Sequence, residues 1–140
     1  MGKRIDNTSC HCLKIRRSAE NVIHFYDTIL APLKITVRQF SLLDSIRHHD
    51  QCSIRELADD TELEKSTLAR SLKPLMKMGY IIDAKEPGAR NSRLTLSKQG
   101  KKLCQEASNL WQQAQERYEE KIGKDSLKQL EMLLEKLQHL

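Results

Sequence analysis

The side chains best suited to chemistry in this 140-residue chain are basic and hydroxyl groups gathered in two stretches between residues 65 and 93. A Ser or Thr hydroxyl donates a hydrogen bond to a phosphate oxygen or a base edge, and an Arg guanidinium binds phosphate or pairs bidentately with guanine. A single Lys or Arg is usually a solvated charge, whereas several on one surface indicate a nucleic-acid site. The candidate DNA contacts, with one small residue that shares their helical arc, are Lys65, Ser66, Thr67, Ala69, Arg70, Lys73, Arg90 and Arg93.

A second group with chemical potential is the sequence Cys10-His11-Cys12. Zinc prefers four N or S ligands in a tetrahedron, so the tight Cys-x-Cys spacing would need further ligands from His24 or from a second subunit. We therefore expect no metal. We expect Cys12 to pack as an apolar side chain in an interface between subunits, and Cys52 and Cys104 to be structural.

The charge and composition exclude several classes of protein. The formal net charge of +5 and the pI of about 9.1 favour a polyanionic partner. No apolar run approaches the roughly 20 residues of a membrane span, and the N-terminus lacks the apolar region of a signal peptide. We therefore expect a cytoplasmic protein with no membrane partner. No acid–base constellation, cofactor loop or metal motif stands out, so we expect no enzymatic activity and no cofactor.

The first basic stretch falls on a predicted helix-turn-helix. Ser53 is expected to cap a short helix over residues 54–60, with Glu56 three positions later completing a capping box. A tight turn then leads to a second helix over about 65–78, whose interior contains Pro74. Because proline removes a backbone donor, we expect Pro74 to kink this second helix.

The second basic stretch falls on a predicted wing. Gly79 is placed to end the preceding helix, and two short β-like runs follow at 80–82 and 93–96. Pro87-Gly88 predicts a turn between these runs, which would put Arg90 in a hairpin loop. A basic hairpin directly after a basic recognition helix is far more specific than either element alone.

Both ends of the chain predict amphipathic helices that one small winged domain cannot cover. The first helix covers about 12–33, Thr36 caps the next, Ser97 caps a long one, and Gly123 separates that helix from the last. The last helix carries a leucine stripe at Leu127, Leu130, Leu134 and Leu137. Packing within one chain is the simpler explanation. We expect instead a homodimer interface, which would place two recognition helices on one face, as a two-fold DNA site requires.

The expected fold class is mainly α with a small β-wing: a winged helix-turn-helix domain plus terminal dimerisation helices. The whole chain, 1–140, is expected to form one domain, with the DNA-binding region over about 36–97 and the dimerisation helices over about 10–33 and 98–140. A helical adaptor without DNA binding is the remaining alternative. Such an adaptor would have no need of a basic hairpin after Gly79.

The order and spacing of these elements resemble the MarR (multiple antibiotic resistance regulator) family of winged helix-turn-helix regulators. The resemblance covers nearly the whole chain, and the stretches that carry it are TVRQFSLLDSI, SIRELADDTELEKSTLARSLKPLMKMGYI and RLTLSKQGKKL. It implies a triangular homodimer that binds a pseudo-palindromic operator in double-stranded DNA, as a repressor that responds to a small aromatic or lipophilic effector. The family's wing commonly carries Asp-x-Arg near its tip. This chain has Gly88-Ala89-Arg90 there, without the acidic partner.

The resemblance also implies an effector cavity between the dimerisation and DNA-reading parts. The residues expected to line it, from the first, second and fifth helices, are Ile15, Ala19, Ile23, Phe40, Leu43 and Trp111. Some family members sense oxidants through a cysteine near the start of the first helix, where Cys12 lies with Cys10 beside it. Lys14 and Arg16 would favour a thiolate there. Redox sensing through this pair is therefore the alternative to a ligand-responsive repressor.

Overall fold

The structure is a computed structural model that describes residues 2–6 and 8–140. Its elements, in chain order, are α1 (His11–Leu30), the 3-10 turn η1 (Ala31–Leu33), α2 (Val37–His48), α3 (Ile54–Thr61), α4 (Lys65–Lys77), β1 (Ile81–Asp83), β2 (Leu94–Leu96), α5 (Lys98–Ile122) and α6 (Lys124–Gln138). The two strands form one antiparallel hairpin. This mainly helical fold with a small wing confirms the predicted fold class.

The helix starts follow the capping residues of the sequence. The Thr36 hydroxyl accepts from the Gln39 amide at 3.1 Å, and the Gln39 side chain accepts from the Thr36 amide at 3.0 Å, which forms a reciprocal capping box. Ser97 caps α5 through the Gly100 amide at 3.0 Å. Ser53 caps α3 through the Glu56 amide. The Glu56 carboxylate meets the Ser53 hydroxyl at 3.2 Å instead of its amide, so the capping box expected here forms only in part.

Several boundaries differ from the sequence prediction by one to three residues. The N-cap of α1 is Cys10, and α1 ends at Leu30 because Pro32 is taken up in the 3-10 turn. The first strand lies at 81–83, one residue later than predicted. Helix α4 continues through Pro74 to Lys77 without an interruption.

The core lies beneath the winged region and joins α2, α3, α4, the wing base and the first half of α5. Its fully buried large side chains are Leu30, Leu43, Ile46, Leu57, Leu68, Leu75 and Leu94. Gly100 in α5 packs directly on the wing base, since a Cβ added there would lie 2.1 Å from the Tyr80 carbonyl oxygen. Only glycine allows this approach of α5 to the strand, and it fixes the wing against the core.

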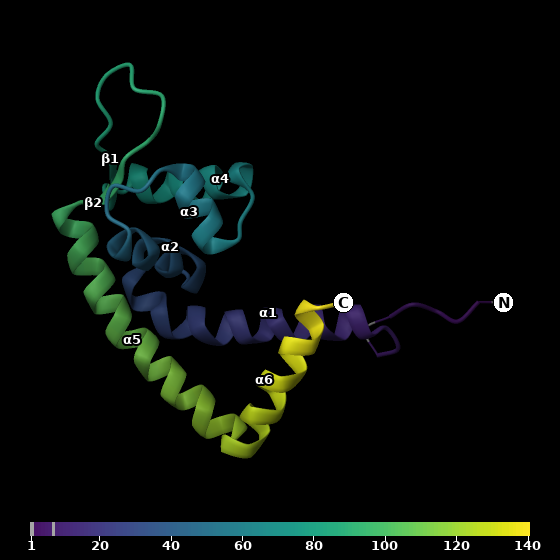
Figure 1. The fold of residues 1–140 in the computed structure, drawn as a ribbon. Helices are drawn as coiled ribbons and strands as arrows, with labels where there is room; N and C mark the ends of the chain where they lie inside the picture. Colours follow the sequence, from purple (N-terminus) through teal and green to yellow (C-terminus); the bar gives the residue numbers. More distant parts are fainter. Residues whose placement is uncertain (1, 7) are drawn as a thin grey trace.

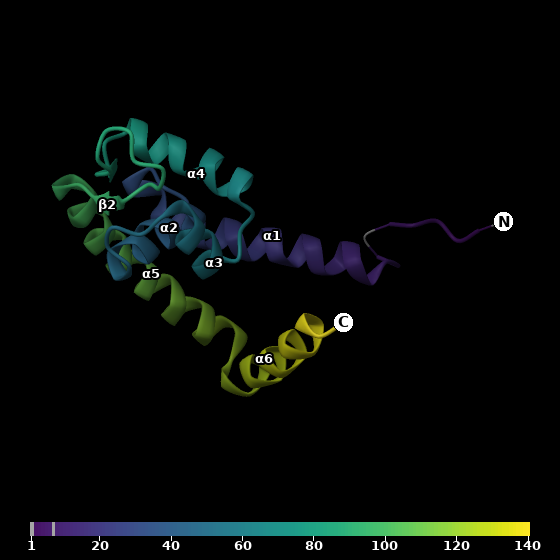
Figure 2. The same ribbon diagram turned by 45° about the horizontal axis from the view of Figure 1, so that its top comes forward.

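Helices α1, α5 and α6 form the end of the molecule opposite the wing (Figures 1 and 2). Gly123, with φ +87°, lies at the sharp bend between α5 and α6 (Figure 1). Tyr26, Phe25 and Tyr118 hold α1 to α5, with the ring centroids of Tyr26 and Tyr118 6.2 Å apart. None of the residues 124–138, all of which are described, is buried. No helix in the described part of the chain is both long and apolar enough to cross a membrane.

Candidate nucleic-acid interface

The turn between α3 and α4 fixes the angle of the second helix. Glu62 adopts a left-handed conformation with φ +57°, and the Leu63 amide donates to the Ala58 carbonyl at 3.2 Å. Helix α4 then buries one face through Leu68, Leu72 and Leu75. The opposite face of α4 is therefore directed outward, as a recognition helix requires.

Four polar side chains form a stripe along this outward face. Successive residues turn about 100° around an α-helix, so positions 66, 70, 73 and 77 lie opposite the leucine face. Ser66, Arg70, Lys73 and Lys77 are all exposed, and the stripe is roughly 16 Å long at 1.5 Å per residue. Lys77 is a candidate that the sequence interpretation missed, although its spacing of four residues from Lys73 was available to find it.

The other predicted residues of α4 lie on the flanks of this stripe. Lys65 and Ala69 are exposed on one flank, and Thr67 is half-buried on the other. The Thr67 carbonyl accepts a hydrogen bond from the Ser71 hydroxyl at 3.0 Å. These three residues are therefore placed to touch a ligand at the edges of the stripe.

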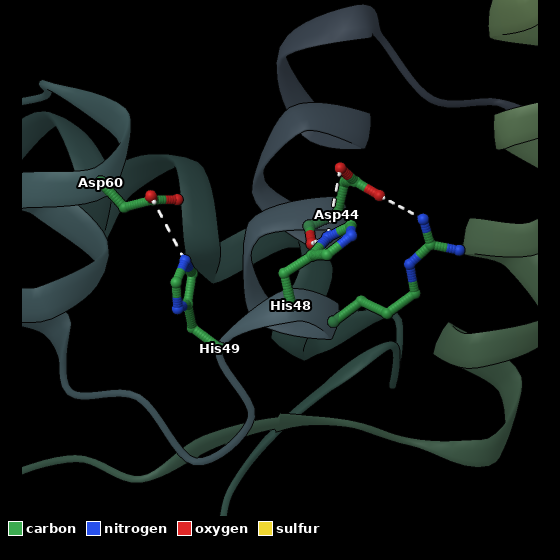
Figure 3. A network of polar contacts seen from close by, with 5 residues as sticks. Asp44, His48, His49 and Asp60 are labelled. Atoms are coloured by element: carbon green, nitrogen blue, oxygen red, sulfur yellow. Dashed lines mark hydrogen bonds and ion pairs between the residues drawn. The ribbon is translucent and has the colours of Figure 1, made fainter.

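A polar network holds α3 to the end of α2 (Figure 3). His49 Nε2 lies 3.4 Å from the Asp60 carboxylate at the end of α3. Within α2, Asp44 pairs with Arg47 at 2.6 Å and with His48 at 3.5 Å. The His49 contact joins the two helices across the turn and supports the orientation of the helix-turn-helix.

The wing projects beyond the helices on the side of the molecule where α4 lies (Figure 1). Its strands pair Ile81 with Leu96 and Asp83 with Leu94. Gly88, with φ +82°, forms the turn at the tip. Arg90 follows this turn and is exposed. The wing therefore presents a cation beside the stripe on α4.

An acidic residue, Asp83, lies at the base of the wing. Its carboxylate accepts from the Arg93 amide at 2.9 Å and from the Lys85 amide at 3.2 Å, and so closes the hairpin loop. These bonds, above all the one from Arg93, lower the pKa of Asp83 below its ordinary value of 3.8. The sequence interpretation missed this residue because it considered only the tip.

We expect the hairpin loop to lose this support in acid. A lowered pKa means that the charged carboxylate stabilises the folded wing above the unfolded value of 3.8, and that this contribution disappears as the pH falls through the folded value. A titration of the Asp83 carboxyl carbon by NMR should therefore give a midpoint below 3.8 in the folded protein and the ordinary value in urea. Equal midpoints in the two states would contradict this role.

The comparisons with known proteins agree with this geometry. Residues 35–88 match the family model described as MarR family. This stretch of the chain, from the residues before α2 to the tip of the wing, therefore resembles the MarR family. The curated regulator SarZ of Staphylococcus aureus (strain USA300) is 27% identical over 93 residues, which are 66% of this chain. The chain spans only 63% of the length of SarZ.

Solved MarR-type structures share the whole fold. A mutant MarR of E. coli complexed with operator DNA has a TM-score of 0.82 at 24% identity, covering 96% of this chain and 99% of its own. The M. tuberculosis transcriptional regulator MosR in complex with DNA has a TM-score of 0.76 at 27% identity, covering 94% and 97%. The repressor CouR bound to p-coumaroyl-CoA has a TM-score of 0.82 at 19% identity, covering 97% of each chain.

Of the six residues predicted to line a MarR-type effector cavity, the structure brings two together. Phe40 and Trp111, whose ring centroids are 6.3 Å apart, line a pocket of about 390 Å³ between α2 and α5. The other residues lining this pocket are Val37, Ser41, Asp44, Arg47 and Ser108. This pocket combines aromatic walls with two hydroxyls and the ion pair of Arg47 and Asp44.

The other four residues lie elsewhere. Leu43 is fully buried in the core, and Ile23 lines a separate pocket between α1, α2 and α4. Ile15 and Ala19 are exposed because only the C-terminal part of α1, from Tyr26 onward, is buried against the rest of the chain. Within one chain, these four residues therefore do not share the pocket of Phe40 and Trp111.

The cysteines fall into two environments. Cys52 and Cys104 are buried, and burial raises the pKa of both thiols. Cys10 is half-buried and Cys12 is exposed, so any burial of Cys12 would have to come from a second chain. Within the residues described, no three His, Cys, Asp or Glu side chains gather closely enough to hold a metal ion.

Proposed function

We propose that this chain is a sequence-specific DNA-binding transcriptional regulator of the MarR family, acting as a homodimeric repressor and not as an enzyme. The observation that carries the proposal is the outward stripe of Ser66, Arg70, Lys73 and Lys77 on α4, with the cationic wing beside it. The structural relatives bound to DNA support it. A regulator that binds chromosomal DNA would act in the cytoplasm.

The proposed contacts divide into base reading and phosphate binding. A recognition helix enters the major groove with its N-terminal residues nearest the base edges, which assigns Ser66 and Arg70 to base reading. Lys73 and Lys77, farther along α4, suit phosphate oxygens. Lys65, Thr67 and Ala69 would contact the groove at its edges. The wing's Arg90 suits the minor groove or the phosphates that border it.

A homodimer is proposed because apolar surface is left uncovered at the end opposite the wing. Met132, Leu133, Leu134 and Leu137 on α6 are exposed by 66%, 56%, 45% and 40%, and Ile15 on α1 by 51%. Several large apolar side chains exposed on one helix are typical of a surface that another protein covers. A two-fold axis through these helices would present two copies of α4 to a pseudo-palindromic operator.

The decisive experiment uses the DNA upstream of the protein's own gene. Fluorescence anisotropy should show tight binding to a fragment that contains an inverted repeat, and much weaker binding to the same fragment with the repeat scrambled. Equal affinity for both fragments would remove sequence specificity from the proposal. Binding to neither, nor to any other genomic fragment, would favour a helical adaptor without DNA binding.

The pocket of Phe40 and Trp111 is the proposed effector site, for a small aromatic or lipophilic compound. The p-coumaroyl-CoA bound by CouR has an aromatic group of this kind. Apolar pockets with a few placed polar groups are typical of small-molecule sites. An effector acts only if it binds one spacing of the two recognition helices better than another.

The chain contains one tryptophan, so its emission reports on this pocket. We expect salicylate-like aromatic acids to quench Trp111 and to release operator DNA over the same range of concentration. Phe40→Leu, which removes the neighbouring ring, should weaken both effects together. Release of DNA without any change in Trp111 emission would place the effector elsewhere.

Redox sensing remains the alternative mode of regulation, and the exposure of Cys12 favours it. Hydrogen peroxide should release the operator from the wild type, but not from Cys10→Ser/Cys12→Ser, if this alternative holds. If the aromatic acid releases the operator from both proteins and peroxide has no effect, the result supports the pocket as the effector site.

A further inference from the structure

The turn after α2 is attached to the wing through three consecutive residues. The Thr95 hydroxyl donates to the Asp50 carboxylate at 2.6 Å, and the Leu94 amide donates to the Cys52 carbonyl at 2.8 Å. Between them, the Arg93 guanidinium donates to the Gln51 side-chain oxygen. Residues 50–52 therefore run alongside β2 and are bonded to it. The same residues lead directly into α3.

Arg93 lies at the centre of this attachment. Its amide donates to the Asp83 carboxylate at 2.9 Å, and its carbonyl accepts from the Ala84 amide at 2.8 Å. With the guanidinium on Gln51, Arg93 thus joins the loop end of the hairpin to the turn before the helix-turn-helix. Both arginines are exposed, but Arg90 lies on the loop beyond this attachment, and its side chain makes no hydrogen bond or ion pair with the residues that the structure describes.

We propose that Arg93 is a positioning residue, with Gln51 as its partner: together they set the direction of the wing relative to α4, while Arg90 makes the wing's contact with DNA. The proposal rests on the proposed DNA-binding function and deepens it. Strands of three residues are marginal as an isolated hairpin, so the wing needs support from outside the hairpin. The sequence predicts Arg93 as a DNA contact, and the geometry of its side chain assigns it to the protein instead.

The two roles differ in their dependence on salt. A cation that neutralises a phosphate releases counterions, and its removal lowers the slope of log affinity against log salt by about one. A positioning residue acts through Arg90, so Gln51→Ala and Arg93→Ala should lower the slope equally, and neither should lower it further in an Arg90→Ala background. The two roles also differ in their partner: only a positioning Arg93 requires Gln51.

The test is a double-mutant cycle with Gln51→Ala, Arg93→Ala and the double variant, and with Arg90→Ala as the matched control. Gln51→Ala and Arg93→Ala, the two brace variants that remove the contact between these side chains, should each weaken operator binding by about fivefold. The double variant should be no weaker than either, and all three should share one salt slope. Arg90→Ala should lower the slope by about one. A lower slope for Arg93→Ala, together with wild-type affinity for Gln51→Ala, would overturn the proposal and make Arg93 a phosphate contact.

A measurement without DNA separates the brace from the DNA-binding function. In both brace variants the amides of Ala84 and Leu94 should exchange faster with solvent, whereas amides in the core of α5 should keep wild-type exchange rates. Wild-type exchange at Ala84 and Leu94 in both variants would overturn the brace. Faster exchange, in a protein that binds no genomic fragment, would support the brace and refute the proposed function.

Discussion

Replacing Leu134 and Leu137 with glutamate is expected to convert the proposed dimer into a monomer. Both side chains are exposed in the single chain, by 45% and 40%, and lie on α6, none of whose residues is buried. A two-fold interface would bury four such leucines, and losing them in favour of carboxylates should cost on the order of 5 kcal/mol, which is roughly four-thousandfold in dimer affinity. Glutamate forms helices well, so α6 itself should persist.

Sedimentation at low micromolar concentration provides the measurement. The wild type should behave as one species near twice 16.2 kDa, and the double variant should sediment near 16.2 kDa. Met76→Glu is the matched control, since Met76 is a helical residue of 40% exposure on α4, outside the proposed interface. A monomeric wild type, or a double variant that stays dimeric, would refute the assignment of this interface.

The consequence for DNA binding follows from symmetry. A monomer offers one α4 to half of an operator, whereas a dimer binds both half-sites with a single loss of translational freedom. The double variant should therefore bind the operator more weakly than the wild type. The affinity should return at protein concentrations high enough to restore the dimer. Binding to an isolated half-site should stay unchanged, because the stripe on α4 is far from α6 (Figure 2).

The sequence predicts the helices well because their signals are local. Thr36, Ser53 and Ser97 cap the helices that follow them, and Gly123 separates α5 from α6. Each cap depends on a hydrogen bond to a residue three positions away, which a short window of sequence contains. The helix-turn-helix and the wing could therefore be found from capping residues, periodicity and turn residues.

The support of the wing could not be predicted in this way. Gln51 and Arg93 are 42 residues apart, and their contact leaves no periodic pattern in the sequence. The sequence of a basic hairpin looks the same whether its arginine binds phosphate or another side chain. The sequence therefore places Arg93 in the right element and cannot assign its partner.

The pocket shows a related limit. Phe40 and Leu43 are both apolar residues of α2, and periodicity places both on its inner side. In the structure Leu43 is fully enclosed by the core, whereas Phe40 borders the space beside Trp111. Which of two buried side chains meets a cavity depends on the packing of α5 across α2, and the sequence of α2 alone does not contain that packing.

Arg70→Ala is expected to weaken operator binding by about 1–3 kcal/mol per half-site and to relax the preference at one base position. Arg70 is the sixth of the 13 residues of α4 and lies on its outward face. It therefore belongs to the N-terminal half, which in a recognition helix is closest to the base edges. A guanidinium paired with guanine loses two directed hydrogen bonds when it is truncated, and only at that base. Lys77→Ala should instead weaken all sequences evenly and lower the salt slope by about one, as a phosphate contact does.

The experiment compares each variant on the operator, on operators with single base substitutions, and on scrambled DNA. Arg117→Ala is the matched control, because Arg117 is an exposed arginine on α5, remote from α4, and its removal changes the net charge equally. If Arg70→Ala weakened the operator and the scrambled DNA by the same factor, Arg70 would be a phosphate contact and base reading would belong to Ser66 or to the flanking residues. If Arg70→Ala, Lys77→Ala and Arg90→Ala all bound like Arg117→Ala, the outward stripe would not be the DNA-reading surface. Two cations on the stripe and one on the wing cannot all border a groove without affecting affinity.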